Sequence, residues 1–519
     1  MIAALRAGGL RVRGLLGRLS MYRLILGALG LLAAVALVLS LFELVVPTAI
    51  ELLATAVVLI AVGCGVDVAA QLVRQRPVRL ESTLITALIL LFVLRPSVEP
   101  AGLLGVALAA AAAALSKHLI AWRGRHILNP AAVGATVVTV VGALLPDAGL
   151  SLSAWWVGSP VLAPAVILTG LAVLLRTEKV RLAALFVVVA TAVYTVRTVV
   201  QLVQFDLAVD LGSVLSSGLL SGPFLFLGAF MLTEPLTLPP RRRQQYLVAV
   251  VVAVLAGWSP LIGGISLGQE RALLIGNLVA FALAIGSRPG AALRLLGRSA
   301  PTPTSHEVVL ESARPISFQP GQYLELEVPH RRPDGRGTRR EFSIVSAPEE
   351  LPTVRVSYRD GTSTYKRALT SLEGGAPLRV TGVWGDFTLP RDEGAPLLWV
   401  AAGIGITPFV SQLRHLELTD RARDIVLVYV VSTGEELAYR DLLARTGIRV
   451  LVWSRDPIEG TPDGWQTETG RLDAAGLAGA VRDIGSRHAY VSGPPALIAG
   501  LSPALRSARS VTTDAFAGY

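Results

Sequence analysis

The chain contains one cysteine, Cys64, among 519 residues. A single thiol excludes an intramolecular disulfide framework, a four-thiolate zinc site and a cysteine-ligated iron–sulfur cluster within this chain, because each needs several cysteines. Histidine is also scarce: before residue 290 there are only His118 and His126, which lie in one basic loop. Haem in a membrane bundle usually needs histidine pairs, so we expect neither haem nor another metal site. Redox chemistry in this chain would therefore depend on organic carriers such as flavin or quinone.

Charged residues are few as well. They make up 16% of the chain against 52% hydrophobic residues, which is too apolar for a purely soluble protein of this length. The excess lies before residue 290, whereas residues 300–519 have ordinary globular composition, so we place the boundary near 290–303. The net charge is +10, but the basic residues stand at the ends of apolar runs without an aromatic-basic stripe. No nucleic-acid partner is expected.

Ten apolar stretches are long enough to cross, or nearly cross, a hydrocarbon core of about 30 Å at about 1.5 Å per helical residue. They cover residues 22–42, 47–70, 81–95, 100–119, 130–146, 159–176, 181–200, 212–233, 245–264 and 270–287. The first 290 residues are thus predicted to form a polytopic α-helical membrane domain of about ten helices.

Basic residues alternate strongly between the connections of these stretches. One side has Arg95, Arg197 and Arg271, whereas the other has twenty Lys and Arg, counting the N-terminal segment and the one after residue 287. Under the positive-inside rule this bias predicts an even number of crossings. We therefore expect a multi-pass protein of the cell membrane, in contact with the lipid bilayer, with both termini cytoplasmic.

The remainder of the chain has two patterns. Short β-rich segments at 305–311, 322–328, 341–346, 353–358 and 377–381 are separated by turns, which predicts a small antiparallel β-barrel over 303–390. Apolar strand candidates then alternate with helical stretches, which predicts an α/β nucleotide-binding domain over 391–519. These strand candidates are Leu397 to Ala401, Ile425 to Val431, Arg449 to Trp453 and Ala489 to Val491.

Arg340, Phe342 and Ser343 form an Arg-x-Phe-Ser motif in the third of the β-rich segments. Together with the later motifs, over essentially all of residues 303–519, it resembles the flavin signature of the ferredoxin–NADP reductase family. The resemblance implies that Arg340 binds the FAD diphosphate, that Phe342 packs on the flavin and that Ser343 hydrogen-bonds near its N5. Taken alone, Phe342 is more often a core residue.

A second segment, Ser363-Thr364-Tyr365-Lys366, resembles the part of this family in which hydroxyl and main-chain N–H groups at a helix start receive the flavin diphosphate. Lys366 would add a positive charge. Gly382, Gly385 and Phe387 resemble the segment that closes the flavin domain, although Val-Trp-Gly stands where the family has Pro-x-Gly.

Gly403-Ile-Gly405-Ile-Thr407-Pro408 follows an apolar strand and opens a helix. Its glycines permit a dinucleotide diphosphate to approach the backbone and the helix N-terminus. Some 85 residues later comes a second group, Ser492-Gly493-Pro494-Pro495. The resemblance implies that both groups bind NAD(P)H, with the Ser492 hydroxyl near the nicotinamide where the family often has Cys. Ser343, Thr407 and Ser492 are the candidate catalytic residues.

The chain ends in two aromatic residues, Phe516 and Tyr519, and in related reductases such an aromatic residue lies against the flavin. The alternative is a disordered tail. The Ser-Thr-Gly-Glu-Glu segment after Val431 lacks the arginine cluster that favours a 2′-phosphate, so NADH is weakly preferred over NADPH, although Arg455 could reverse this preference.

Two motifs with polar residues fall at helix ends that the charge count predicts to be cytoplasmic. Asn129 belongs to His126-Ile-Leu-Asn-Pro-Ala-Ala, and Thr233 and Glu234 belong to Phe230-Met-Leu-Thr-Glu-Pro. Residues 81–240 resemble the D subunit of Rnf complexes and the B subunit of sodium-pumping NADH:quinone reductases. The resemblance implies that these three residues hold a flavin or quinone; polar groups at such depth are commonly functional. The alternative is that Asn129 and Thr233 cap helices. The family's threonine motif for covalent FMN is missing, so any FMN would be noncovalent.

The fusion predicts a membrane-bound oxidoreductase. NAD(P)H would reduce FAD, and electrons would pass to a membrane flavin or quinone and then to a membrane acceptor or further electron-transfer subunits. One alternative is a redox-driven ion or solute transporter. A membrane anchor is another, but ten spans with polar ends exceed what anchoring requires.

Overall fold

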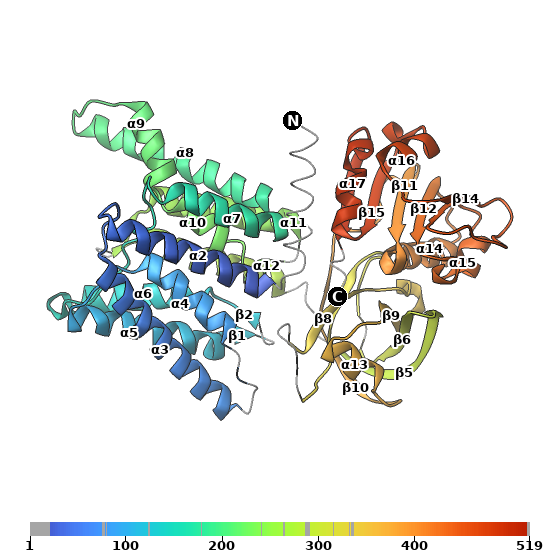
Figure 1. Cartoon of the computed structure of the whole chain (residues 1–519), viewed down its shortest axis with the longest axis horizontal. Helices are drawn as coiled ribbons and strands as arrows, with labels where there is room; N and C mark the ends of the chain where they lie inside the picture. The colour runs from blue at the N-terminus through green and yellow to red at the C-terminus, as the bar shows by residue number, and fades with distance from the viewer. Residues whose placement is uncertain are drawn as a thin grey trace. The chain divides into compact units, whose positions relative to one another are not determined.

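The structure is a computed structural model with two compact units, Leu15–Ile285 and Gly286–Tyr519. It describes residues 21–74, 78, 80–122, 125–177, 179–239, 241–262, 265–285, 291–314, 316–331, 333 and 337–515. We call residues 15–285 the helical unit and residues 286–519 the C-terminal unit. Figure 1 shows the first as a bundle of helices and the second as two sheets with flanking helices.

Each of the ten apolar stretches forms helix. Their bounds are α2 Met21–Leu41, α3 Ala49–Val73, α4 Glu81–Val93, α5 Pro100–Leu119, α6 Pro130–Leu144, α7 Ala163–Thr177, α8 Val180–Gln204, α9 Leu211–Ser216 continuing through η2 Ser217–Ser221, α10 Phe224–Phe226 and η3 Leu227–Met231, then α11 Arg242–Trp258 and α12 Gly268–Ile285. Local chemistry sets several starts: Thr48 and Glu51 form a capping box before α3, and prolines occupy the first positions of α5 and α6.

Fewer helices can span a membrane than the sequence predicted. Among the described residues, five are long and apolar enough: Tyr22–Leu41, Ala49–Val73, Pro100–Leu119, Val180–Gln204 and Gly268–Ile285. A sixth span results if the bent pair Leu211–Ser221 and Phe224–Met231 is one span. The others are shorter: α4 has 13 residues and covers about 20 Å at about 1.5 Å per residue. Ten crossings are therefore not confirmed.

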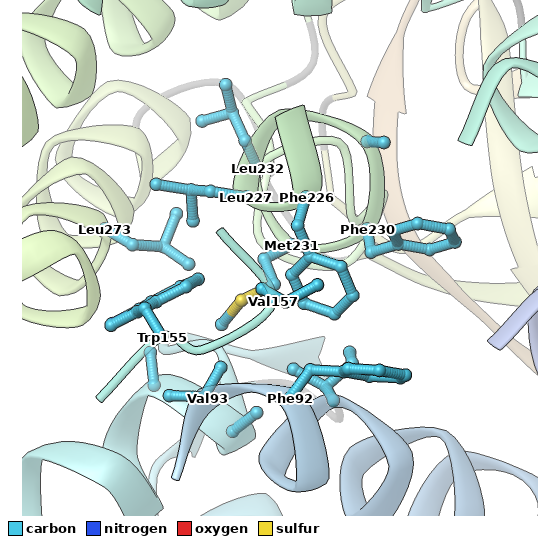
Figure 2. Close-up of a cluster of buried hydrophobic side chains, with 14 of the residues drawn as sticks. Phe92, Val93, Trp155, Val157, Phe226, Leu227, Phe230, Met231, Leu232 and Leu273 are labelled. Atoms are coloured by element: carbon cyan, nitrogen blue, oxygen red, sulfur yellow. The ribbon is translucent and has the colours of Figure 1, made fainter. Parts of the chain in front are cut away.

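The bent pair has a local cause. Its two parts meet at 44° around Gly222 and Pro223, where proline has no N–H and a side chain on Gly222 would meet the Gly218 carbonyl oxygen at 2.3 Å. Beyond the bend, the helix packs through Phe226, Phe230 and Met231 (Figure 2). The Phe226 ring lies 5.4 Å from that of Phe92 on α4, so the bend is held inside the apolar core.

The C-terminal unit begins with a six-stranded antiparallel sheet in the order β8-β7-β10-β5-β6-β9. Its strands are β5 Ala291–Thr302, β6 Ser305–Ser312, β7 Tyr323–Glu327, β8 Arg339–Ser343, β9 Thr353–Arg359 and β10 Pro377–Trp384, with α13 Thr364–Thr370 beside them. One bridge, Ile344 to Val356, joins the chain after β8 to β9. A closed barrel stays a prediction. The sheet starts with β5, before the predicted boundary at residue 303, because 291–302 pairs with β6 and β10.

The parallel sheet predicted for the last part of the chain is confirmed, with the order β14-β13-β12-β11-β15-β16. Its strands are β11 Leu397–Ala402, β12 Ile425–Val431, β13 Arg449–Ser454, β14 Gln466–Thr469, β15 His488–Gly493 and β16 Ser510–Ala515. Its helices are α14 Thr407–Leu418, α15 Arg440–Arg445, α16 Ala474–Ala480 and α17 Pro495–Leu505. The exposed strands β14 and β16 were not predicted.

Candidate nucleotide and flavin site

The turn after β11 brings a glycine loop against β15. Gly403 has φ +51° and opens a short helical turn, η5 Gly403–Ile406, before α14. A Cβ on Gly405 would stand 2.5 Å from the Ser492 carbonyl oxygen and 3.1 Å from its Oγ. Only glycine permits this approach, so the two groups found in sequence meet at the carboxyl edge of the parallel sheet, where such sheets bind nucleotides.

Two hydroxyl groups at this edge, those of Thr407 and Ser492, differ in their hydrogen bonding. Thr407 is buried and its Oγ1 donates to the Ile404 carbonyl oxygen at 3.0 Å, so it stabilises the turn. Ser492 is fully buried, and its Oγ has no hydrogen-bond partner among the described residues. A buried unpaired hydroxyl is costly, and a ligand that hydrogen-bonds it would remove that cost. Ser492 beside Gly405 therefore fits a nicotinamide nucleotide.

Gly493 and Pro494 follow Ser492 and set the next turn. A Cβ on Gly493 would stand 2.9 Å from that of Ala402, and Pro494 precedes the first turn of α17. On the other side, β16 pairs Ser492 with Asp514 and Gly493 with Ala515. Phe516 and Tyr519 lie outside the described residues.

On β8, Arg340 and Phe342 lie on the same face of the strand, two residues apart. The Arg340 guanidinium donates to the carbonyl oxygens of Arg339 and Gly337, at 2.6 and 3.2 Å, and lies 4.9 Å from the centroid of the Tyr365 ring. Phe342 is 8% exposed and packs against Tyr365 in the core of this sheet. This placement favours the core interpretation of Phe342.

The second flavin segment forms the start of α13, as predicted. Ser363 caps it by accepting from the Lys366 N–H at 3.2 Å, and the Lys366 Nζ donates to the Arg359 carbonyl oxygen at 2.5 Å. The Thr364 Oγ1 lies 3.3 Å from His330 Nε2. These groups are thus gathered at one helix start.

Tyr365 follows these residues and was overlooked in the sequence. Its hydroxyl donates to the buried Leu326 carbonyl oxygen at 2.8 Å, and burial raises the pKa of this phenol well above its ordinary value. Tyr365 therefore stays neutral and ties α13 to β7. Its ring also supports Arg340, so a core residue links the two predicted flavin segments.

The two sheets of the C-terminal unit are joined beside Ser343. This residue is buried at the end of β8, and two residues later Val345 already belongs to the core around α14. The Ser346 carbonyl oxygen accepts from Ser411 Oγ on α14 at 2.8 Å. The candidate flavin serine therefore lies at the junction with the glycine loop's own helix, and a hydride donor and acceptor would meet at such a junction.

The three candidate residues of the helical unit have partners. Asn129 Oδ1 accepts from the Ala132 N–H at 3.0 Å and so caps α6, while its Nδ2 donates to Glu234 Oε2 at 2.8 Å. The Thr233 hydroxyl donates to the Ala229 carbonyl oxygen within its own helix. The structure thus brings Asn129 and Glu234 together, and Thr233 has the local role of the alternative interpretation.

A cavity of about 610 Å³ in the helical unit was not foreseen. It is lined by the bend at Ser221 and Pro223, by Trp155 and by Glu270 and Arg271. Glu270 is 1% exposed and accepts from Trp155 Nε1 at 2.8 Å, and its other oxygen pairs with Arg271 at 2.9 Å. No sequence motif indicates this cavity, because the residues that line it belong to connections that are far apart along the chain.

Comparison with known proteins locates the clearest similarity in the parallel sheet. Residues 399–502 match the family described as the oxidoreductase NAD-binding domain. The reductase subunit of an aromatic O-demethylase from Amycolatopsis sp. is 30% identical over 139 residues, which are 26% of this chain and 40% of that protein. Ferredoxin–NADP reductase B of Sorangium cellulosum is 34% identical over 149 residues, 27% of this chain and 58% of that protein.

The reductase component of propane 2-monooxygenase from Mycolicibacterium smegmatis is 25% identical over 216 residues, 38% of this chain and 58% of that protein. The chain thus spans about half the length of the curated relatives it matches. Among solved structures, a ferredoxin NADP+ reductase from Neisseria gonorrhoeae with bound FAD and NADP is 18% identical, with a TM-score of 0.38; the match covers 44% of this chain and 99% of that chain. The sequence matches thus make the C-terminal unit similar to flavin-dependent NAD(P)H reductases, and its parallel sheet matches an oxidoreductase NAD-binding domain.

Proposed function

We propose that the whole chain is a membrane-bound NAD(P)H-dependent oxidoreductase that moves electrons from its C-terminal unit to a carrier in its helical unit. The observation that carries the reductase part of this proposal is the approach of Gly405 to Ser492, together with the junction at which the chain after Ser343 meets α14. The glycine loop approaches Ser492, whose buried hydroxyl has no partner among the described residues, and the end of β8 enters the core around the helix that follows the loop. FAD, when bound, accepts hydride from NAD(P)H and releases electrons one at a time.

The roles of the residues follow from their places. Arg340, Ser363, Thr364 and Lys366 hold the FAD diphosphate around the start of α13, where positive charge and N–H groups favour an anion. Gly403 and Gly405 admit the nicotinamide nucleotide to the edge of β11. Thr407 shapes the loop through its bond to Ile404, and Ser492 orients the nicotinamide. The Ser343 hydroxyl lies at the flavin end of the junction.

The cofactor preference is proposed to be NADH. After β12 the chain continues through η6 Gly434–Glu436, and the Glu436 carboxylate accepts from Thr304 Oγ1 at 2.8 Å. This interaction holds a negative charge on the segment that follows the second strand, where related folds contact the ribose. A 2′-phosphate would meet electrostatic repulsion there.

A membrane location for the helical unit is supported by its surface. Large apolar side chains are exposed along its helices, among them Val57 at 65%, Leu168 at 70%, Val188 at 66% and Leu278 at 53%. Exposure of so many large apolar side chains is unfavourable in water and favourable in lipid. We propose a multi-pass cell-membrane protein of up to ten crossings with both termini cytoplasmic, where NAD(P)H is available.

The electron acceptor is proposed to be noncovalent FMN or a quinone held near Asn129 and Glu234. Two of the relatives named above are a reductase subunit and a reductase component, which supports further electron-transfer partners for this chain. The resemblance of residues 81–240 to Rnf and sodium-pumping subunits supports the same direction of electron flow.

A redox-driven transporter is the second candidate. It is favoured by the bent helix pair, whose break lines the cavity beside buried Glu270. Broken membrane helices commonly form solute and ion sites. Turnover that requires sodium, or solute uptake into proteoliposomes driven by NADH, would favour this candidate over a plain oxidoreductase.

An anaerobic titration of the detergent-purified chain with NADH tests the main proposal, with flavins identified and counted after acid release. Two flavins that are reduced in sequence would support an internal relay into the helical unit. One FAD that is reduced by NADH and reoxidised by a quinone would support a quinone site. One FAD that quinone does not reoxidise would contradict the membrane-carrier part of the proposal.

A further inference from the structure

A buried polar cluster lies at the ends of α3, α4 and α5. Asp67 of α3 is 3% exposed, and its carboxylate pairs with His118 Nε2 at 2.7 Å and accepts from Gln71 Nε2 at 2.8 Å. The Thr83 hydroxyl of α4 also donates to Asp67 and accepts from Lys117 Nζ at 3.0 Å. A carboxylate, an imidazole and an ammonium are thus connected inside an apolar helical unit.

The cluster continues toward the candidate carrier site. Lys117 is 8% exposed at the end of α5, and α5 packs along α6, whose N-terminal cap is Asn129. Glu234 in turn accepts from Asn129, whose backbone N–H donates to Asn277 Oδ1 of α12 at 2.8 Å. These groups therefore connect the ends of α3 and α5 with the start of α6 and the middle of α12.

All the connections beside this cluster belong to the basic side of the helical unit. Asp67 lies seven residues before Arg74, and Lys117 and Asn129 flank the loop of residues 120–128. We call this side the basic face. A charged group at Asp67 is thus about 10 Å from the helix end, at about 1.5 Å per residue.

An apolar layer ends the cluster on its other side. Along α12, Asn277 belongs to the cluster, Leu273 is one turn away, and Glu270 lines the cavity one turn further. Figure 2 shows Leu273 together with Trp155 and Met231 in a cluster of buried hydrophobic side chains. Along α12, the buried side chain of Leu273 thus separates Asn277 from Glu270 at the cavity.

Buried ionisable groups in a membrane protein are costly and are retained for a task. No step of electron transfer from NADH to FAD uses Asp67, His118 or Lys117, which belong to the other unit. Their arrangement is that of a proton relay, since carboxylate, imidazole and ammonium each exchange a proton with a hydrogen-bonded neighbour.

We propose that Asp67, His118 and Lys117 form a proton relay that carries protons from the basic face toward a quinone reduced beside Asn129 and Glu234. The inference rests on the proposed function, which supplies the electrons. A quinone that takes up two electrons needs two protons, one on each oxygen, to become the quinol. NADH supplies the two electrons and one proton equivalent, and one further proton comes from water, so NADH, H⁺ and quinone give NAD⁺ and quinol.

The relay has further ionisable neighbours. Cys64 of α3 lies one turn from Asp67 and interacts electrostatically with Asp67 and Lys117, and His126 interacts with Lys117, His118 and Asp67. Their proximity means that changes at one relay residue alter the charge felt by the others. Two electron acceptors must therefore be compared in the same variant.

The experiment uses the full-length chain in detergent and measures NADH oxidation by ferricyanide, which takes electrons without protons, and by a short-chain quinone. Asp67→Asn keeps the hydrogen-bonding shape and removes the carboxylate; His118→Gln does the same for the imidazole. Thr169→Val is the matched control, because Thr169 is a buried hydroxyl whose bond lies within α7.

In both relay variants we expect an unchanged ferricyanide rate and a quinone rate lower by at least about 100-fold, the usual contribution of a positioned proton donor. A solvent deuterium isotope effect larger than in the wild type should accompany the loss, because proton delivery then limits turnover. Thr169→Val should leave both rates unchanged.

Unchanged quinone rates in the two relay variants would overturn the relay, as would equal losses with both acceptors in every relay variant that folds. If Asp67→Asn fails to fold, His118→Gln decides between these outcomes. A wild-type chain that reduces ferricyanide but no quinone would refute the quinone as carrier, and the relay would fall with it, whereas the reductase role of the C-terminal unit would stand.

Discussion

Gly405→Ala is the sharpest perturbation of the nucleotide site, because the added methyl group would face backbone. Its Cβ would stand 2.5 Å from the Ser492 carbonyl oxygen and 2.9 Å from the carbonyl carbon. Neither atom belongs to a flexible side chain, so η5 or β15 must shift. The shift would move the glycine loop away from Ser492 and open the nucleotide site.

The magnitude follows from the cost of overpacking. Inserting one methyl group into a packed region costs about 1–3 kcal/mol. If the nucleotide-bound state bears this cost, kcat/KM for NADH falls about 5- to 140-fold, since about 1.4 kcal/mol is tenfold. Binding of FAD should not change, because Gly405 lies on the parallel-sheet side of the junction.

Steady-state kinetics with NADH and ferricyanide, together with flavin content, measures this prediction. Gly374→Ala is the matched control, because a Cβ there meets nothing within 4 Å and Gly374 has ordinary φ. The control should keep wild-type kcat/KM. If Gly405→Ala kept wild-type kcat/KM for NADH, the assignment of this loop to the nucleotide would be refuted.

Three further changes test other parts of the C-terminal unit. Arg340→Ala should raise the Kd for FAD at least about tenfold, since a charge-assisted hydrogen bond contributes about 1.5–3 kcal/mol, and flavin content after gel filtration would show it; full flavin content would contradict the role of Arg340. Ser492→Ala should leave thermal stability equal or higher, because it removes an unpaired buried hydroxyl. The same change should lower the rate of hydride transfer measured by stopped-flow absorbance; an unchanged rate would exclude Ser492 from the site. Arg487→Gln should destabilise the unit at neutral pH by about 1–3 kcal/mol in denaturant titrations, since it breaks bonds to Asp483 and the Leu397 carbonyl oxygen. The Arg487 hydrogen bond lowers the pKa of Asp483 below its ordinary value, so the difference from wild type should be fully present at neutral pH and shrink as this carboxylate is protonated in acid; a difference that grows in acid would contradict this linkage.

Much of the C-terminal unit was predictable because its signals are local. Alternating apolar residues, turn glycines and the strand-to-helix change at Gly403 each describe a few neighbouring residues, and these strands appeared where expected. The exposed strand β14 was missed because its residues, such as Thr467 and Glu468, are polar on both faces. Strand β5 was missed because Arg294, Arg298 and the glycine between them indicate a linker, whereas partners far along the chain make the strand.

Pairing across the fold also changed the interpretation of single residues. Phe342 was assigned to the flavin from its motif, but its ring packs against Tyr365, which was itself overlooked. A sequence motif identifies which residue types occur at a given spacing. The neighbouring elements of the sheet determine which side chains each of these residues packs against. The two segments that are predicted to bind the diphosphate were found separately, yet the Tyr365 ring packs against the Arg340 guanidinium and joins them.

The polar cluster of the helical unit could not be predicted from the sequence. Asp67 has valines on both sides in α3, so its place in the sequence indicates nothing beyond an unfavourable residue in a predicted membrane span. Two of its partners, Thr83 on α4 and His118 on α5, lie 16 and 51 residues further along the chain, and the third, Gln71, lies four residues away on α3 itself. The cost of burying a carboxylate nevertheless requires such partners. A lone charge in an apolar helix is therefore a prediction that other polar residues surround it, and the structure identifies them as Thr83, Gln71 and His118.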